Sequence, residues 1–344
     1  MRWFRAIIFL TLLALHVLGA AQAARQAPAE AGAVQRVLVV HSYNPGYIWT
    51  DTLAKGIQGA LPGDGITLET HYLDAKRDLD PESLAAKAQA ILRRIEHWRP
   101  QVVIASDDAA QIYLTQPFLK GRPWPQVIFC GVNAPLKTYG FPAANVSGVR
   151  ERWHFRESFA LLKKLAPRAT RAAMLSDGSE SSAYVLADLA QDQRQNGPFA
   201  LALVASEQVQ TFQQWQRKVQ DYQTRADALA LGLYHSLRDE RTGGVVPPET
   251  VMAWTNAANR LPSIGFTDYA VGGGLLCGVL ESAHEQGYLA GTMARQVLEK
   301  KLAAGALPVR TNVRGTVLLN LKTAERLGLR IPFEFIQAAG IIIK

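Results

Sequence analysis

Polar side chains recur in this chain at the points where short apolar runs end. Ser42 and Tyr43 follow the run 37–40, and two aspartates follow the run 102–105. Hydroxyl, amide and carboxylate groups can hydrogen-bond a small molecule, and carboxylates can also hold a cation. The residues selected on this basis as ligand-binding candidates are Ser42, Tyr43, Trp49, Asp107, Asp108, Ala109, Ala110, Asn133, Asp177, Ser179, Ser181, Tyr234 and Asp268.

Two adjacent carboxylates, Asp107 and Asp108, stand where a helix is expected to begin. Ser106 or Asp107 can cap that helix, and its exposed backbone N–H groups suit an anion. A carboxylate at Asp108 exceeds what capping requires and could accept hydrogen bonds from a ligand ammonium. The alternative is a favourable interaction with the helix dipole. Ala109 and Ala110 leave this helix end open to close approach. We expect Asp108→Ala to weaken ligand binding without unfolding the protein.

The aromatic and amide candidates have structural alternatives that the sequence leaves open. Trp49 could form a wall for a flat ligand, or it could pack its own loop against the protein together with Tyr47. Asn133 can donate and accept through one side chain, which suits an amide or a carboxylate. It also suits a turn before Pro135.

The second half of the chain repeats this pattern. Small hydroxyls near Asp177, at Ser179 and Ser181, would form an anion-binding corner at a helix N-terminus, with simple capping as the alternative. Tyr234 and Asp268 end two later apolar runs. No one of these signals is specific. Their recurrence at the same position in both halves is the stronger indication of a binding site.

Signatures of enzymes and of metal sites are missing from the sequence. It contains no G-x-S-x-G nucleophile elbow, no G-x-x-x-x-G-K-[ST] phosphate loop and no H-E-x-x-H motif. Asp107 and Asp108 are adjacent, so they do not face each other across a substrate as an acid and a base would. The histidines and the two cysteines lack metal-ligand spacing. We therefore expect a binding protein that is not an enzyme and has no metal or cofactor.

The elements that must position these side chains alternate along the chain. Apolar runs alternate with amphipathic stretches, which predicts β-α-β units and parallel sheets. Two consecutive series predict two α/β lobes, and open parallel sheets bind ligands outside the carboxyl ends of their strands. We expect strands at 36–42, 66–73, 101–106, 125–133, 171–177, 199–205, 227–234, 261–268 and 315–320. We expect helices at 50–61, 81–98, 107–119, 155–165, 181–197, 212–224, 249–260, 282–302 and 321–329.

The N-terminus has the pattern of a secretory signal peptide. Two arginines precede an apolar run from 6 to 17, and an Ala-Gln-Ala cleavage site follows at 21–23. We assign 1–23 to a cleavable signal and 24–33 to a flexible lead-in. The apolar run is shorter than the roughly 20 residues of a membrane-spanning helix, although an uncleaved anchor is the alternative. A soluble periplasmic protein is the expectation.

Composition and charge narrow the classes of partner. The net charge is +8, but the basic residues are scattered rather than arranged in a stripe, so nucleic acid is not expected. With 48% hydrophobic and 19% charged residues, the chain resembles ordinary globular proteins and is long enough for two domains. Cys130 and Cys277 could pair in an oxidising compartment or remain buried thiols.

Four stretches carry a family resemblance: VLVVHSYNPGYIWTDTLAKGI, WRPQVVIASDDAA, VIFCGVN and LNLKTAERLGLRIP. They resemble the ABC-transporter substrate-binding family typified by tryptophan-type binding proteins. The resemblance runs from about residue 34 to the C-terminus. The segments SDDAA and FCGVN are similar to a branch that also occurs as periplasmic sensor domains. The family implies a periplasmic-binding protein type I-like fold, in which two doubly wound parallel-sheet lobes are joined by three crossovers and a hinge and close on a small ligand. It also implies that the candidate residues above face the ligand in the interlobe cleft.

The resemblance sets the expected organisation and function. One lobe would comprise 34–149 and about 262–312, and the other 150–261 and about 313–344. We expect a monomeric periplasmic solute-binding protein that captures a small molecule, such as an amino acid or a related compound, and delivers it to an ABC-type permease. The alternative is a sensing module that works with a separate membrane signalling protein. Because SDDAA is more acidic than typical amino-acid binders, a cationic or amine-bearing ligand gains credibility.

Overall fold

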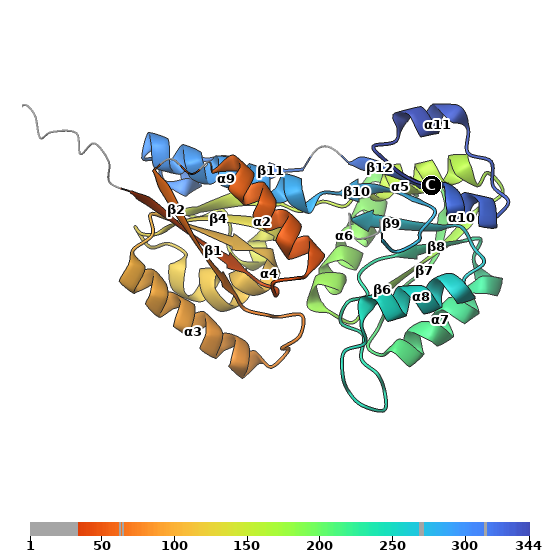
Figure 1. The fold of residues 1–344 in the computed structure, drawn as a ribbon, viewed down its shortest axis with the longest axis horizontal. Helices are drawn as coiled ribbons and strands as arrows, with labels where there is room; N and C mark the ends of the chain where they lie inside the picture. The colour runs from red at the N-terminus through yellow and green to blue at the C-terminus, as the bar shows by residue number, and fades with distance from the viewer. Residues whose placement is uncertain (1–33, 62, 64, 268–271, 313–314) are drawn as a thin grey trace, which may run out of the picture.

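The computed structural model describes residues 34–61, 63, 65–267, 272–312 and 315–344; the assigned signal peptide, the lead-in and Asp268 lie outside these ranges. The described chain forms two α/β lobes that lie side by side (Figure 1). No helix in these ranges is both long and apolar enough to cross a membrane.

Each lobe is built on one sheet. The first sheet has the order β11-β5-β4-β3-β1-β2, and its strand pairs are parallel. The second has the order β13-β12-β10-β9-β8-β6-β7, in which β10 and β12 pair antiparallel and the other described pairs are parallel. The prediction of two parallel-sheet lobes is confirmed. The strands are β1 (Gln35–His41), β2 (Ile66–Tyr72), β3 (Val102–Ser106), β4 (Gln126–Val132), β5 (Val146–Arg150), β6 (Arg171–Asp177), β7 (Ala202–Val209), β8 (Ala228–Leu231), β9 (Ser263–Thr267), β10 (Cys277–Glu281), β11 (Arg310–Thr311), β12 (Thr316–Asn320) and β13 (Ile341–Ile343).

The helices follow the predicted alternation with one difference in type. The segment 107–119 was expected to be a single helix; the structure has one α-helical turn followed by a π-helix that contains Pro117. The helices are α2 (Ile48–Ala60), α3 (Pro81–Trp98), α4 (Asp107–Ala110), the π-helix η1 (Gln111–Leu119), η2 (Leu136–Thr138), α5 (Phe155–Leu165), α6 (Glu180–Asn196), α7 (Phe212–Arg225), α8 (Pro248–Ala258), α9 (Ala283–Lys300), η4 (Ala304–Ala306), α10 (Leu321–Arg326) and α11 (Phe333–Ala338).

Strand side chains alternate between two cores in the first lobe. Val37 and Val39 of β1 belong to the cluster that includes α2 and α9 side chains. Leu38 and Val40 belong to the cluster on the opposite face, which includes α3 side chains. This arrangement explains why the central strands read as continuous apolar runs, since a parallel sheet covered on both faces buries every residue. Because both faces of the sheet are buried, the polar residues of the site lie at the ends of the strands.

Two strands that sequence reasoning missed, β5 and β10, each contain a glycine. A Cβ atom on Gly148 would lie 2.1 Å from the Phe129 carbonyl oxygen, and one on Gly278 would lie 2.3 Å from the Gly265 carbonyl oxygen. Glycine in these strands permits close approach of a neighbouring backbone. Glycine also interrupts the apolar pattern that identifies a strand in the sequence. For this reason neither segment was expected to be a strand.

Helix α9 returns late in the chain to the first lobe, where it lies against α2 (Figure 1). Glycines permit this contact, because a Cβ on Gly56 would lie 2.2 Å from the His284 carbonyl oxygen and one on Gly287 would lie 2.0 Å from the Leu53 carbonyl oxygen. From the sequence, we expected the chain to return to the first lobe near residue 262. Strands β9 and β10 instead belong to the second sheet, so the chain crosses after Glu281.

The chain passes between the sheets at three places in the described structure: between β5 and α5, between β10 and α9, and between β11 and β12. A buried polar network ties these passages together. The Asn312 amide donates to Glu281 and to the Arg152 carbonyl oxygen, the latter at 2.9 Å, and Gln286 donates to Glu281 at 2.8 Å. The network lies where a hinge between the lobes must bend.

The two cysteines are free thiols that lie in different lobes. Cys130 is buried in β4 and Cys277 is buried in β10. The first belongs to the apolar core beside α2 and α9, and the second to the core of the second lobe. Of the two alternatives left open by the sequence, the structure has the buried thiols.

Candidate functional site

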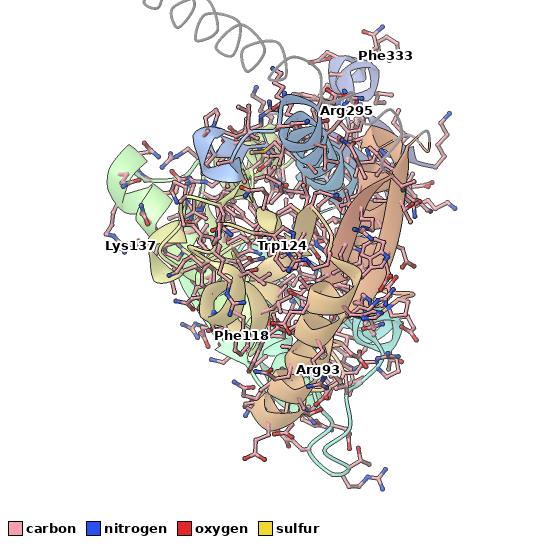
Figure 2. The ribbon with its side chains drawn as sticks, turned by 90° about the vertical axis from the view of Figure 1, so that its left-hand side faces the viewer. Arg93, Phe118, Trp124, Lys137, Arg295 and Phe333 are labelled. Atoms are coloured by element: carbon pink, nitrogen blue, oxygen red, sulfur yellow. The ribbon has the colours of Figure 1, made fainter. Side chains whose placement is uncertain are left out.

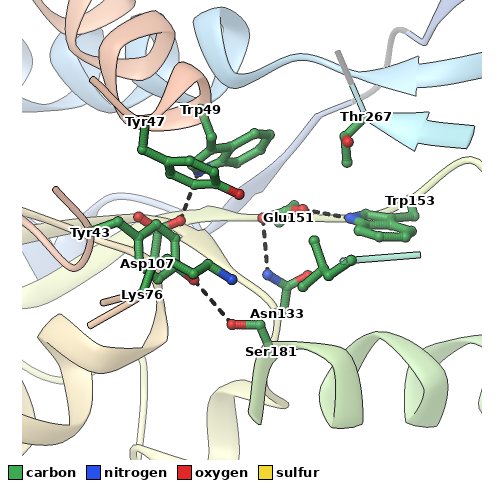
Figure 3. A pocket seen from close by; sticks show the side chains of 11 residues that line it. Tyr43, Tyr47, Trp49, Lys76, Asp107, Asn133, Glu151, Trp153, Ser181 and Thr267 are labelled. Atoms are coloured by element: carbon green, nitrogen blue, oxygen red, sulfur yellow. Dashed lines mark hydrogen bonds between the residues drawn. The ribbon is translucent and has the colours of Figure 1, made fainter. Parts of the chain in front are cut away.

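A small cavity lies between the lobes, at the carboxyl ends of the strands of both sheets, within about 290 Å³ of atom-free space that is partly open to solvent. Figure 3 shows side chains from both lobes and from the first crossover converging on it. Its lining residues are Tyr43, Tyr47, Trp49, Lys76, Asp107, Asn133, Glu151, Trp153, Ser181, Leu233 and Thr267.

Asp107 presents its carboxylate to the cavity from an unusual backbone conformation. It directly follows β3 and has φ of 64°, in the left-handed region that non-glycine residues seldom adopt. Oδ1 accepts a hydrogen bond of 2.8 Å from the Trp49 indole, and Oδ2 accepts one of 2.8 Å from the Ser106 hydroxyl. Gly131 leaves room for this carboxylate, because a Cβ there would lie 2.8 Å from Oδ1. Strain held by surrounding contacts is common at functional sites.

Glu151 supplies a second buried carboxylate from the first crossover. Oε1 accepts a hydrogen bond of 2.6 Å from the Trp153 indole, and Oε2 accepts one of 3.0 Å from the Asn133 amide. Burial raises the pKa of Asp107 to about 7 and raises that of Glu151 well above its usual range, although the accepted hydrogen bonds oppose both shifts. A cation in the cavity would relieve this cost by stabilising the ionised carboxylates.

Aromatic rings surround these carboxylates. Trp49 and Trp153 each donate an indole N–H to one of them, so the rings are held in place around the cavity (Figure 3). Tyr43 and Tyr47 lie edge to face with centroids 5.5 Å apart. Carboxylates combined with aromatic faces form an environment suited to an organic cation.

Asp108 supports the site rather than opening into this cavity. Its carboxylate accepts hydrogen bonds from the backbone N–H groups of Asn133 and Ala134, at 3.2 and 3.1 Å, and from the Tyr139 hydroxyl at 2.8 Å. The aspartate thereby fixes the loop after β4 that carries Asn133. Burial raises the pKa of Asp108 to about 6, against the effect of these hydrogen bonds.

The second lobe contributes two hydroxyls, those of Ser181 and Thr267. Ser181 stands in the first turn of α6. Thr267 ends β9 and is 1% exposed, and within the described residues its hydroxyl has no hydrogen-bond partner. A buried hydroxyl without a partner costs free energy. In a cavity lining, such a group is available to a ligand.

Contacts across the cleft hold the lobes together. The hydroxyls of Tyr43 and Ser181 are 3.0 Å apart, and the rings of Tyr47 and His235 meet edge to face with centroids 5.2 Å apart. Beside the cavity, Arg150 of β5 forms an ion pair with Asp188 of α6 at 2.7 Å. The structure is therefore a closed form.

The structure brings together five of the residues selected from the sequence. Tyr43, Trp49, Asp107, Asn133 and Ser181 line the cavity. Asp108, Ala109 and Ser179 instead line a neighbouring interlobe cavity, together with Tyr43, Ser181 and Lys76.

The other candidates lie elsewhere. The Ser42 hydroxyl is used internally, since it donates to the Ser106 carbonyl oxygen and accepts from the Ala110 N–H group. Asp177 accepts from hydroxyls and N–H groups of its own lobe, and Tyr234 stacks on His235. None of the four candidates Ser42, Ala110, Asp177 and Tyr234 is among the described residues that line the interlobe cavities. Asp268 lies outside the described residues.

Sequence reasoning missed Lys76, Glu151, Trp153, Leu233 and Thr267 as lining residues and left Tyr47 open. Thr267 immediately precedes the selected Asp268. Glu151 and Trp153 follow β5, the strand that Gly148 concealed, so no strand end was sought there. Lys76 follows β2 and had the same positional signal as the others. Its position shortly after a predicted strand was the signal in the sequence that could have identified it.

Comparison with known proteins decides the family. A family model described as ABC transporter substrate binding protein matches residues 49–342. The chain belongs to this family. The resemblance inferred from the sequence is confirmed. No curated protein sequence matches the chain.

Several solved structures share the fold. The ABC domain in complex with L-Trp from Streptococcus pneumoniae has a TM-score of 0.67 at 20% identity, covering 90% of this chain and 99% of that chain. The ligand-free, open structure of CD0873 from Clostridium difficile has a TM-score of 0.66 at 17% identity, covering 90% and 100%. The TorS sensor domain–TorT complex has a TM-score of 0.55 at 11% identity, covering 89% and 96%. The predicted periplasmic-binding protein type I fold is confirmed.

Proposed function

We propose that this ABC transporter substrate-binding protein captures a small organic solute bearing an ammonium group in its interlobe cavity. The observation that carries the proposal is the pair of buried carboxylates, Asp107 and Glu151, which line one interlobe cavity among aromatic rings. Each carboxylate is oriented by an indole N–H group and keeps further acceptor capacity.

The electrostatics favour a cation over a neutral solute. Two buried carboxylates beside each other resist ionisation, because burial and mutual repulsion both disfavour the charged forms. A ligand ammonium supplies the missing positive charge and hydrogen-bond donors at once. A neutral sugar supplies no positive charge, so it would not favour the ionised forms of these two groups.

The aromatic lining favours a solute with a flat or apolar portion. Trp49, Trp153 and Tyr47 offer ring surfaces around the carboxylates. The similar fold of the protein with bound L-Trp makes amino acids and related amines the first compounds to examine.

Delivery to an ABC permease follows from lobe closure. A ligand that contacts both lobes stabilises the closed form by its greater affinity for that form. The closed form would then be recognised by a membrane permease. For a protein of this family with the predicted N-terminal signal, we place this step in the periplasm and expect the protein to act as a monomer.

A sensing role is the second candidate. The fold similarity to the TorS sensor domain–TorT complex shows that this architecture also occurs in assemblies containing a sensor. In that case the closed form would be recognised by a membrane signalling protein, and the ligand site would be unchanged.

A thermal-shift screen tests the ligand proposal. The protein is stripped of bound compounds by partial unfolding and refolding, then mixed with amino acids, amines, sugars and small carboxylates. A ligand at about a hundred times its Kd adds about 2.7 kcal/mol of stability, equivalent to a rise of several degrees. Stabilisation by an amine-bearing compound is expected. Stabilisation by a sugar or another compound without an amine would overturn the proposal.

A further inference from the structure

Lys76 is a buried lysine whose ammonium has no acceptor among the described residues. It lies in the loop after β2, and its side chain is 6% exposed. Its ammonium lies 4.7 Å from the centroid of the Tyr43 ring and 5.9 Å from that of Tyr47. Within the described structure it forms no hydrogen bond or ion pair. Buried lysines are normally paired, and Lys76 borders the interlobe space, so an anion there would be a favourable partner.

Among the described residues, the charged groups near Lys76 form no direct ion pair or hydrogen bond with it. Asp177 is affected by the lysine charge, but its carboxylate already accepts hydrogen bonds from Ser179, Ser182 and the Ser236 N–H group. Asp107 also experiences this charge. Another titratable neighbour is His235, whose pKa burial lowers to about 3, so it is neutral at physiological pH.

The position of Lys76 connects it with the ligand site. It lines the same interlobe cavity as Asp107 and Glu151 and also lines both neighbouring interlobe cavities. Figure 3 shows its side chain reaching into the first of these cavities from the side of Tyr43. The hydroxyls of Tyr43 and Ser181 line the same space and can donate to an anion.

We propose that Lys76 binds a carboxylate of the ligand, so that the solute is a zwitterion whose ammonium is held by Asp107 and Glu151. This inference rests on the proposed function and deepens it. A solute that is only a cation would bring a second positive charge beside Lys76, whereas a zwitterion meets an opposite charge at each end. A phosphate is less suitable, since one lysine would face a dianion beside two carboxylates and none of the described lining residues is an arginine.

Matched compounds separate this inference from the proposed function. Each set shares one side chain: L-tryptophan, tryptamine and indole-3-propionate; L-tyrosine, tyramine and 3-(4-hydroxyphenyl)propionate; L-arginine, agmatine and 4-guanidinobutyrate. Calorimetric titration of the stripped protein is expected to show binding of one amino acid, with its decarboxylated and deaminated analogues at least about tenfold weaker. An amine that binds as tightly as its amino acid would overturn the zwitterion inference and leave the amine site standing. No binding by any compound would overturn both.

Variants of Lys76 provide a second, independent test of the zwitterion inference. Lys76→Met is expected to weaken amino-acid binding at least about tenfold, and Lys76→Arg to retain more of it. Lys137→Met is the matched control, because Lys137 is an exposed lysine of the first lobe away from the cavity lining (Figure 2). Unchanged affinity in Lys76→Met would show that the lysine only compensates Asp177 and would overturn the inference. If Lys76→Met does not fold, the matched compounds on the unaltered protein decide.

Discussion

The Tyr43 hydroxyl of the first lobe lies 3.0 Å from the Ser181 hydroxyl of the second. Tyr43 follows β1 and Ser181 stands in the first turn of α6, so this hydrogen bond joins the two halves of the chain across the cleft. Both residues line the interlobe cavity and its larger neighbour. The contact therefore links lobe closure directly to the place where a ligand would bind.

Removing this hydrogen bond should favour the open form. Tyr43→Phe deletes one hydroxyl and keeps the ring, so the closed form loses about 0.5–1.5 kcal/mol relative to the open form. Small-angle X-ray scattering of the stripped protein is expected to give a larger radius of gyration for Tyr43→Phe. Tyr288→Phe is the control, because Tyr288 is a 47% exposed tyrosine on α9. Identical scattering for Tyr43→Phe and the unaltered protein would show that the contact does not stabilise closure.

Substitutions of Asp107 should separate binding from folding. Asp107→Asn keeps the shape and suits a left-handed backbone, so its stability should stay close to that of the unaltered protein while affinity for an amine falls at least about tenfold. Asp107→Ala also loses the acceptor for the Trp49 indole and places alanine at φ of 64°, which should cost about 2–3 kcal/mol. Denaturant unfolding and calorimetric titration measure the two effects. An Asp107→Asn protein with full affinity would remove this carboxylate from the ligand contacts.

Thr267→Val is expected to act in opposite directions on stability and on binding. The hydroxyl is buried and has no partner among the residues that the structure describes, so valine should leave the stripped protein equally stable or stabilise it by about 1 kcal/mol, while ligand affinity falls. Thr115→Val is the matched control, since the Thr115 hydroxyl is also buried without a partner but does not line the cavity. Thermal unfolding with and without ligand checks both variants. Equal ligand stabilisation in the two would argue against contact between Thr267 and the ligand.

Ligand affinity should rise with pH between about 5.5 and 7.5. Burial raises the pKa of Asp107 to about 7 and that of Asp108 to about 6, so below these values the empty site holds protons. A bound ammonium lowers the pKa of a neighbouring carboxylate, so binding displaces protons and is weaker at low pH, by up to about tenfold per pH unit for each proton. Titration in buffers of different ionisation enthalpy should detect proton release that Asp107→Asn reduces. Proton uptake on binding would contradict this mechanism.

The structure changes the expectation for Asp108→Ala. The sequence led us to expect weaker binding in a folded protein, but this carboxylate accepts from two backbone N–H groups and the Tyr139 hydroxyl. Leaving these donors buried without a partner should cost about 2–4 kcal/mol, with weaker binding arising through the displaced Asn133 loop. Denaturant unfolding should show the loss beside an unaffected Glu334→Ala control, an exposed residue of α11. A stable Asp108→Ala protein with weakened binding would restore the earlier expectation.

Much of the fold was predictable because its strands are buried on both faces. The run at β3 is apolar and completely buried, so its pattern identified the strand, and the polar residues after it identified its carboxyl end. The same reasoning led to Asp107 and Asn133. It did not distinguish the two aspartates at this helix start, because their roles depend on the φ of 64° at Asp107 and on the loop after β4.

The rest of the site depends on contacts between distant segments. Glu151 becomes part of the cavity only because β5 joins the first sheet, and Gly148 obscured that strand. Thr267 and Lys76 come from different lobes and meet one cavity only after closure. The position of α9 likewise depends on glycine contacts with α2, which no local pattern reveals.

The most direct test of the binding account is to identify the compound retained by the purified protein. Mass spectrometry of small molecules released on denaturation would compare the unaltered protein with the Asp107→Asn, Glu151→Gln double variant. The account predicts one amine-bearing compound released in near-stoichiometric amount from the unaltered protein and lost from the variant. Equal retention by both proteins, or a retained compound without an amine, would contradict it.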